Sequence, residues 1–273
     1  MLNKTIENPG GIPDSLSSRL HWINSSNVLC NYMKKLEYLE LILKNKAIIP
    51  RYVIEPITYL GIKEPQNICF PMTCFCDIPF SRVNSHMTNY GSYGIALDKE
   101  SLIRKYKVQP IQYMNSDSPL AQDFKEVFTR YYKADKKLPT TARPLLNYVL
   151  STLVYMKPIL GLQSDDDGNE YQYIFQDECE WRYIPLEFPK ELHFLLRQSE
   201  TTEKGRDTYS EALKNHPETW LKLEWEDVRY IIVPDEAASR KIIDIIKELP
   251  LGDNDKYMLM SKIEVSKRFS EDM

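Results

Sequence analysis

The chain has 273 residues, of which 42% are hydrophobic and 27% charged, and its formal net charge is -4. These values are typical of a globular protein and exclude a disordered chain, and the lack of a basic excess disfavours a broad nucleic-acid-binding surface. No apolar run approaches the roughly 20 residues of a membrane span, and five scattered cysteines favour a reducing compartment over a disulfide framework. We therefore expect a cytoplasmic protein without membrane contact.

The amino-terminal region is predicted to contain a loose arm, one strand and one helix. Residues 1–18 are polar and include several Pro and Gly residues, which is typical of an arm. Residues 19–24 (RLHWIN) are short, apolar and aromatic, which favours a strand. Residues 28–45 place apolar side chains at spacings of three and four, the pattern of an amphipathic helix. The next stretch, AIIPRYVIEP, is expected to be extended because Pro50 and Pro56 exclude a helix.

The rest of the chain is predicted to be rich in strands that are not in regular strand–helix–strand alternation. Such a pattern favours an α+β fold with a mixed or antiparallel central sheet and flanking helices, in a single domain over residues 19–273. The stretch 198–218 is expected to be a surface loop or short helix. Strands are predicted for residues 67–76, 90–98, 110–114 and 178–187 and for the second part of 163–176. Helices are predicted for residues 118–132 and 142–155. Residues 228–249 are predicted to form a strand followed by a helix.

The stretch PMTCFCDIPFSRVNSHMTNYGSYGIALDKE (71–100) allows three interpretations: a metal site, a buried sheet or the wall of a pocket. Zinc ligands usually occur as C-x2-4-C pairs, whereas Cys74 and Cys76 form a C-x-C pair that places both thiols on one face of a strand. We predict that both cysteines pack in the core and bind no metal. No electropositive setting marks a catalytic cysteine, and no glycine-rich phosphate loop is present.

Polar and aromatic residues at or beside strand positions favour the pocket wall. Glu178, Glu180 and Arg182 alternate along ECEWR and are expected on one face, where they form either a working site or a structural ion-pair network. Asp77 is expected at the rim of the pocket, where it caps a backbone segment or pairs with Arg51. The candidate set is His21, Trp22, Arg51, Glu55, Asp77, His86, Tyr90, Tyr93, Glu180 and Arg182.

The stretch 71–100 closely resembles the signature of AbiGi-type abortive phage resistance proteins of bacteria. The segment LILKNKAIIPRYVIE, the later ECEWRYIP and the final RYIIVPDE are similar to that family too, so the resemblance spans residues 19–248. It implies a role in antiviral defence. Because members are often described as the antitoxin-like half of a pair, it also implies a partner toxin or a phage component.

The order of elements is similar to that of ADP-ribosyltransferases, with DarT-like toxins as the nearest analogy, although a Ser-Thr-Ser-type middle strand is missing. This similarity implies NAD as a substrate, with His21, Tyr93 (or Tyr90) and Glu180 (or Glu178) as catalytic residues. Under this interpretation, nucleic acid is a partner only as a target that the protein modifies. Three functions stay open: an ADP-ribosyltransferase-like or NAD-cleaving effector, a non-catalytic antitoxin, and a sensor of NAD-like nucleotides. The NAD-binding residues implied are Trp22, Arg51, Glu55, Asp77, His86, Tyr90 and Arg182.

Overall fold

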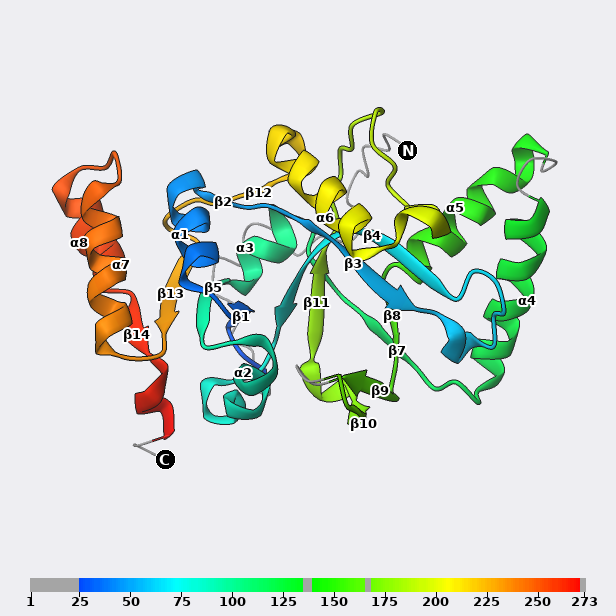
Figure 1. Ribbon diagram of the computed structural model, residues 1–273, viewed down its shortest axis with the longest axis horizontal. Helices are drawn as coiled ribbons and strands as arrows, with labels where there is room; N and C mark the ends of the chain where they lie inside the picture. The colour runs from blue at the N-terminus through cyan, green and yellow to red at the C-terminus, as the bar shows by residue number, and fades with distance from the viewer. Residues whose placement is uncertain (1–24, 135–138, 165–167, 271–273) are drawn as a thin grey trace, which may run out of the picture.

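The computed structural model describes residues 25–134, 139–164 and 168–270, which form an α+β structure around one large sheet (Figure 1). The predicted arm over residues 1–18 and the predicted strand over residues 19–24, with His21 and Trp22, lie outside the described residues. Within the described ranges, no helix combines the length and the apolar character that a membrane crossing requires.

The central sheet has eight strands in the order β14-β13-β5-β1-β4-β11-β6, with β3 paired to β4 off this path. Only the β13–β14 pair is parallel, and the other pairings in this sheet are antiparallel, which confirms the predicted α+β class with a mixed sheet. The strands are β1 (Val28–Met33), β3 (Arg51–Pro56), β4 (Asn67–Cys76), β5 (Tyr93–Asp98), β6 (Gln109–Pro110), β11 (Glu180–Tyr183), β13 (Val228–Val233) and β14 (Ile263–Val265).

Three two-stranded sheets flank the central one. One of them, the parallel pair of β7 and β8, brings the segment after the fifth helix beside the central sheet and so positions Lys157. The pairs are β7 (Gln112–Met114) with β8 (Met156–Pro158), β9 (Leu160–Ser164) with β10 (Glu170–Ile174), and β2 (Ala47–Ile48) with β12 (Leu221–Lys222).

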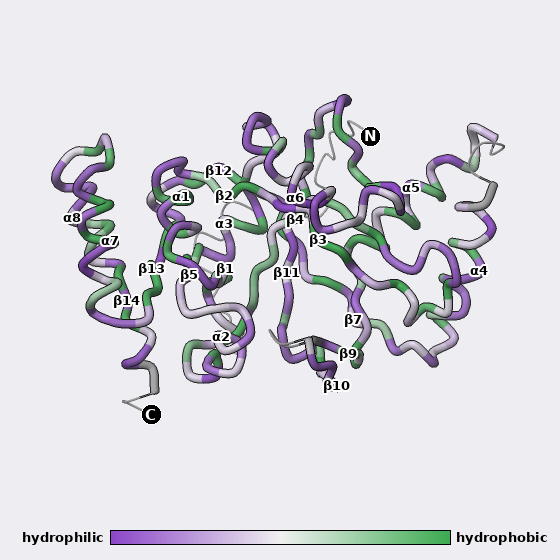
Figure 2. The backbone as a smooth tube through the Cα atoms, viewed as in Figure 1, coloured by the Kyte–Doolittle hydropathy of each residue, from purple (hydrophilic) through white to green (hydrophobic). Residues whose placement is uncertain are grey.

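Helices cover both faces of the sheet because successive strand residues point to opposite sides. Ile231 of β13 packs in the largest core cluster, with α1, α3, α7 and α8, whereas Ile232 packs in a smaller one, with α2. Figure 2 shows hydrophobic and hydrophilic residues alternating along α7, as expected of a helix that covers a sheet with one side. The helices are α1 (Leu36–Asn45), α2 (Asn84–Tyr90), α3 (Lys99–Arg104), α4 (Pro119–Ala134), α5 (Arg143–Leu153), α6 (Glu203–Ala212), α7 (Glu236–Glu248) and α8 (Asp253–Met260).

The helix predicted for residues 28–45 is only half correct. Residues 28–33 form β1, which pairs with β5 over six residues, and the helix begins at Leu36. Leu29 and Met33 are four residues apart, an even spacing that places them on one face of a strand as well as of a helix. The strand predicted for residues 90–98 likewise begins at Tyr93, because residues 84–90 form α2.

Gly91 allows the sharp change of direction between α2 and β5. Its φ is +105°, and a Cβ at this position would lie 2.2 Å from the backbone oxygen of Met33. A residue with a side chain cannot come so close to β1, so glycine is required here for two separate reasons.

Candidate functional site

A cavity of about 220 Å³ lies where β1 and β3 separate along β4. Asn31 spans part of the gap, since its side-chain amide donates a hydrogen bond to the backbone oxygen of Cys74 at 2.8 Å. The thiols of Cys74 and Cys76 also line the cavity, which confirms that the C-x-C pair shares one face of β4. The other polar residues of the lining are Tyr32, Glu55, His86, Tyr90, Lys157, Glu178 and Glu180.

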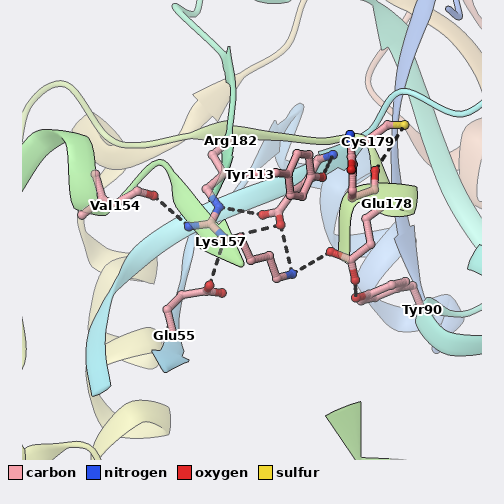
Figure 3. Close-up of polar contacts among 10 residues, drawn as sticks. Glu55, Tyr90, Tyr113, Val154, Lys157, Glu178, Cys179 and Arg182 are labelled. Carbon is pink, nitrogen blue, oxygen red and sulfur yellow. Dashed lines mark hydrogen bonds and ion pairs between the residues drawn. The ribbon is translucent and has the colours of Figure 1, made fainter. Parts of the chain in front are cut away.

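Five ionic side chains, four buried and one (Lys157) mostly buried, form one connected group at this cavity, which we call the charge cluster: Glu55, Lys157, Glu178, Glu180 and Arg182 (Figure 3). The ammonium of Lys157 lies 2.6 Å from Glu178 and 3.1 Å from Glu180. The guanidinium of Arg182 lies 2.7 Å from Glu180 and 3.1 Å from Glu55. Each of the two cations therefore bridges two carboxylates.

Further hydrogen bonds hold the charge cluster in place. The fully buried Arg182 donates from Nη1 to the backbone oxygen of Val154 at 2.8 Å, and the hydroxyl of Tyr90 donates to Glu178. The backbone N–H of Glu180 donates to the hydroxyl of Tyr113 at 2.7 Å. These contacts come from α2, β7 and the end of α5, so the cluster is fixed from several sides.

Strand register explains why Glu180 and Arg182 share the cavity side of β11. Glu180 lies across from Cys76 and Arg182 lies across from Cys74, and both cysteines face the cavity. Glu178 is different, because it lies in a 3-10 helix (Phe175–Glu178) and Cys179 has a φ of 44°. The predicted strand alternation therefore does not reach Glu178. The carboxylate of Glu178 joins the other charged groups through its ion pair with Lys157 and not through the alternation of side chains along a strand.

Glu180 and Lys157 of the cluster are both charged at neutral pH. Burial raises the pKa of Glu180, but the positive charges of Arg182 and Lys157 outweigh this effect and lower it to about 2. Burial lowers the pKa of Lys157, but the surrounding carboxylates raise it well above its ordinary value. General acid–base catalysis is most efficient when the pKa lies near the working pH. Glu180 is therefore suited to stabilise positive charge and not to transfer protons.

An aromatic group completes the cavity. His86 stacks on Tyr90 with ring centres 4.4 Å apart, and the ring of Tyr32 meets His86 edge-on at 5.7 Å. The hydroxyl oxygen of Tyr32 and Nδ1 of His86 are buried and have no hydrogen-bond partner among the described residues. Burial raises the pKa of Tyr32, so its hydroxyl stays neutral. Two polar atoms beside the cavity are thus available to a ligand.

The cavity thiols are not activated nucleophiles. A hydrogen bond with Cys30, followed by burial, raises the pKa of Cys76 well above its ordinary value, and burial raises that of Cys74. Because the thiolate is the reactive form, both side chains are inert at neutral pH. No group of three or more His, Cys, Asp and Glu side chains in the described ranges is arranged to hold a metal ion.

Several predicted site residues lie elsewhere. Asp77 does not line the cavity: it pairs with Lys99 and accepts a hydrogen bond from the backbone N–H of Ser26 at 3.0 Å. Of its two predicted roles, Asp77 therefore has backbone capping and not the pair with Arg51, and its predicted place at the rim of the pocket is wrong. Arg51 lies at the exposed start of β3 and pairs with Asp207 at 3.7 Å.

Tyr93 also lies away from the cavity. It packs against the core cluster that contains α1 and α7, on the other side of the sheet from Tyr90. The predicted grouping of Tyr93 with Glu180 is therefore wrong. Of the predicted set, the structure brings together Glu55, His86, Tyr90, Glu180 and Arg182, with Arg182 behind the lining residues.

Lys157 and Tyr32 were not among the predicted site residues. One signal for Lys157 is present in the sequence, since it is the only charged residue in the apolar run Tyr155-Met156-Lys157-Pro158-Ile159. A lone charge in such a run indicates a buried, paired side chain. Tyr32 carries no comparable signal, because it falls inside a stretch with helical spacing.

Comparison with known proteins agrees with the resemblance seen in the sequence. A family model described as "Putative abortive phage resistance protein AbiGi, antitoxin" matches residues 46–234, a range that contains the whole charge cluster. The chain is 32% identical over 248 residues to the abortive phage resistance protein AbiGi of Lactococcus lactis subsp. cremoris, which covers 83% of this chain and 99% of the relative. No solved structure matches the chain. The chain therefore belongs to the AbiGi family of abortive phage resistance proteins.

Proposed function

We propose that this chain acts in abortive phage resistance as an antitoxin, a protein that binds a partner toxin and keeps it inactive. The description of the matching family supports this role. The main support for this proposal is the way in which Glu180, the best-placed catalytic candidate, is bound by its neighbours. Both of its oxygens are bound by the cations Arg182 and Lys157, and its low pKa removes it from proton transfer. The charge cluster is thus a rigid internal network, as a binding protein requires.

The β9–β10 hairpin supplies a surface suited to such a partner. Leu160 lies across from Ile174, and Leu162 is two residues further along the same face of β9. These side chains are 64%, 48% and 61% exposed, respectively. Large apolar side chains that gather on one exposed face are typical of protein interaction sites. We propose that the toxin binds to this face of the β9–β10 hairpin.

Growth assays test the proposal. Expression of the chain alone should leave bacterial growth unchanged, and co-expression with a toxin of the same defence locus should restore growth that the toxin alone arrests. The double variant Leu160→Ser/Leu162→Ser should lose this protection, whereas the control Leu186→Ser, which changes a residue of similar exposure (63%) outside the hairpin, should keep it. Growth arrest by the chain alone would overturn the antitoxin role.

A second candidate function is cleavage or transfer chemistry on NAD. The observation that favours it is the placement of permanently anionic Glu180 in one cavity with the aromatic rings of Tyr90 and His86. A carboxylate of this kind can stabilise the oxocarbenium-like charge that forms when the nicotinamide bond breaks. The assay is release of nicotinamide from NAD by the purified chain. Glu180→Gln should abolish it, and a folded Glu180→Gln variant with unchanged release would remove this candidate.

A further inference from the structure

We infer that the cavity beside the charge cluster binds a small organic cation. The carboxylates of the cluster outnumber its cations among the described residues. Within these residues, the cluster holds three carboxylates, Glu55, Glu178 and Glu180, and two cations, Lys157 and Arg182. The side chains of the three carboxylate residues are 12%, 3% and 6% exposed, respectively. An unbalanced charge is costly at such burial, and one bound positive charge would balance the group.

Glu55 is the residue at which the additional cation has an available partner. Glu178 has one oxygen bound by Tyr90 and the other by Lys157, and both oxygens of Glu180 are bound as well. Arg182 binds Oε2 of Glu55. The side chain of Glu55 is 12% exposed and lines the cavity, so a ligand there can reach its carboxylate.

The rest of the lining suits the same ligand. The hydroxyl of Tyr32 and Nδ1 of His86 are buried, line the cavity and are unpartnered among the described residues, so they can accept hydrogen bonds from N–H groups of a ligand. The rings of Tyr32, His86 and Tyr90 offer electron-rich faces or edges that attract a cation once water is displaced. Charge and aromatic surface therefore favour one class of ligand.

The same features exclude other ligands. A phosphate would meet three carboxylates, and the one ammonium of the lining, that of Lys157, is already bound to two of them. The volume of about 220 Å³ lies below the range of about 300–1,000 Å³ that is usual for drug-sized ligands. The cavity therefore encloses a single ring or a short amine, so that of a dinucleotide only the nicotinamide end would fit inside it. This assignment requires neither the antitoxin role nor catalysis.

A pair of probes that differ in charge tests the inference. Isothermal titration of the full chain should show saturable binding of 1-methylnicotinamide, a flat cation, and no binding of nicotinamide, its neutral counterpart, at the same concentrations. Putrescine serves as a second cation without a ring, and its binding in place of 1-methylnicotinamide would support an alkylammonium ligand. Equal binding of nicotinamide and 1-methylnicotinamide, or no binding of either cation, would overturn the inference.

Two variants locate the ligand. Glu55→Gln keeps the shape of the side chain and removes its charge, and it should weaken cation binding by at least about tenfold. Tyr32→Phe removes a hydroxyl that has no hydrogen-bond partner among the described residues, so the fold should persist while binding weakens. Glu187→Gln, an exposed change away from the cavity, is the matched control and should bind like the wild type. Unchanged affinity in both folded cavity variants would contradict the site. The growth assays on the hairpin variants are independent of this result, so the two proposals can fail separately.

Discussion

Lys99 and Asp77 form an ion pair in the interior, with only 1% and 9% of their side chains exposed, and this pair joins the two ends of the CFCDIP…IALDK segment. The ammonium of Lys99 also donates to the hydroxyl of Ser25 at 2.9 Å and lies 5.1 Å from the ring centre of Trp181. The pair thus fastens the start of the described chain to the end of β4. The characteristic residues of this segment are in part structural.

Loss of one partner from this pair should destabilise the protein strongly. Lys99→Met leaves the carboxylate of Asp77 buried without a cation, and we expect the free energy of unfolding to fall by about 3–5 kcal/mol. The control is Lys44→Met, which breaks an exposed pair with Glu40 on α1 and should cost far less, because solvent screens an exposed pair. Urea unfolding of both variants measures the difference. Equal effects of the two changes would mean that the buried pair contributes no more than a surface pair.

The stability supplied by Glu180 should depend on pH in one direction. Its pKa in the folded protein, about 2, lies below its ordinary value of 4.5. The contribution is therefore complete above pH 4.5 and is lost as the pH falls towards 2, and it amounts to about 3 kcal/mol at 1.36 kcal/mol per pKa unit. Glu180→Gln should be less stable than the wild type by this order at pH 7, and the two proteins should converge near pH 2. If the two proteins differed by the same free energy of unfolding at pH 7 and at pH 2, the ion pairs of Glu180 would not be the source of the difference.

Local patterns in the sequence predict the elements whose signals are local. The apolar run of β4 and the strand–helix unit of β13 and α7 are both found where expected, because strand and helix periodicity are properties of neighbouring residues. The start of α1 is misplaced because the spacing of Leu29 and Met33 fits a strand and a helix equally well.

The charge cluster is only partly predictable. Glu180 and Arg182 follow from alternation along β11, but Lys157 reaches them through the pairing of β7 with β8, across 21 or more residues of sequence. No local pattern encodes that register. Tyr93 shows the opposite error: it is three residues from Tyr90, yet the turn at Gly91 sends the two rings to opposite sides of the sheet.

Substitution of Gly91 should reveal how closely α2 approaches β1. Gly91→Ala combines a positive φ with a Cβ that would meet the backbone of Met33, so part of the structure must shift. Gly168→Ala is the matched control, since its φ is +84° but its Cβ would meet nothing within 4 Å. We expect the control to cost about 1 kcal/mol and Gly91→Ala to cost clearly more. Thermal unfolding of the two variants gives the comparison, and similar melting temperatures would contradict the close approach.

Thiol labelling should separate the five cysteines by environment. Cys179 is exposed, whereas Cys30, Cys69 and Cys76 are buried and the high pKa of Cys74 keeps its thiol protonated. Iodoacetamide should therefore label Cys179 of the native protein first, at a rate that rises with pH because partial burial raises the pKa of this thiol, and all five thiols after unfolding. Mass spectrometry of the labelled protein, with Cys179→Ser as the control, counts the modified sites. Rapid labelling of Cys74 or Cys76 in the native state would show that the cavity activates its thiols.

The hydrogen bond from Tyr90 to Glu178 joins residues that are 88 positions apart, so the ribosome produces one part of the site well before the other. Glu55 and Tyr90 leave the ribosome before either balancing cation has been synthesised. Until β11 emerges, β4 lacks one neighbour and presents a hydrogen-bonding edge that can pair with other chains. Translation that stops before Glu180 therefore releases a fragment that cannot assemble the cavity and is prone to aggregate.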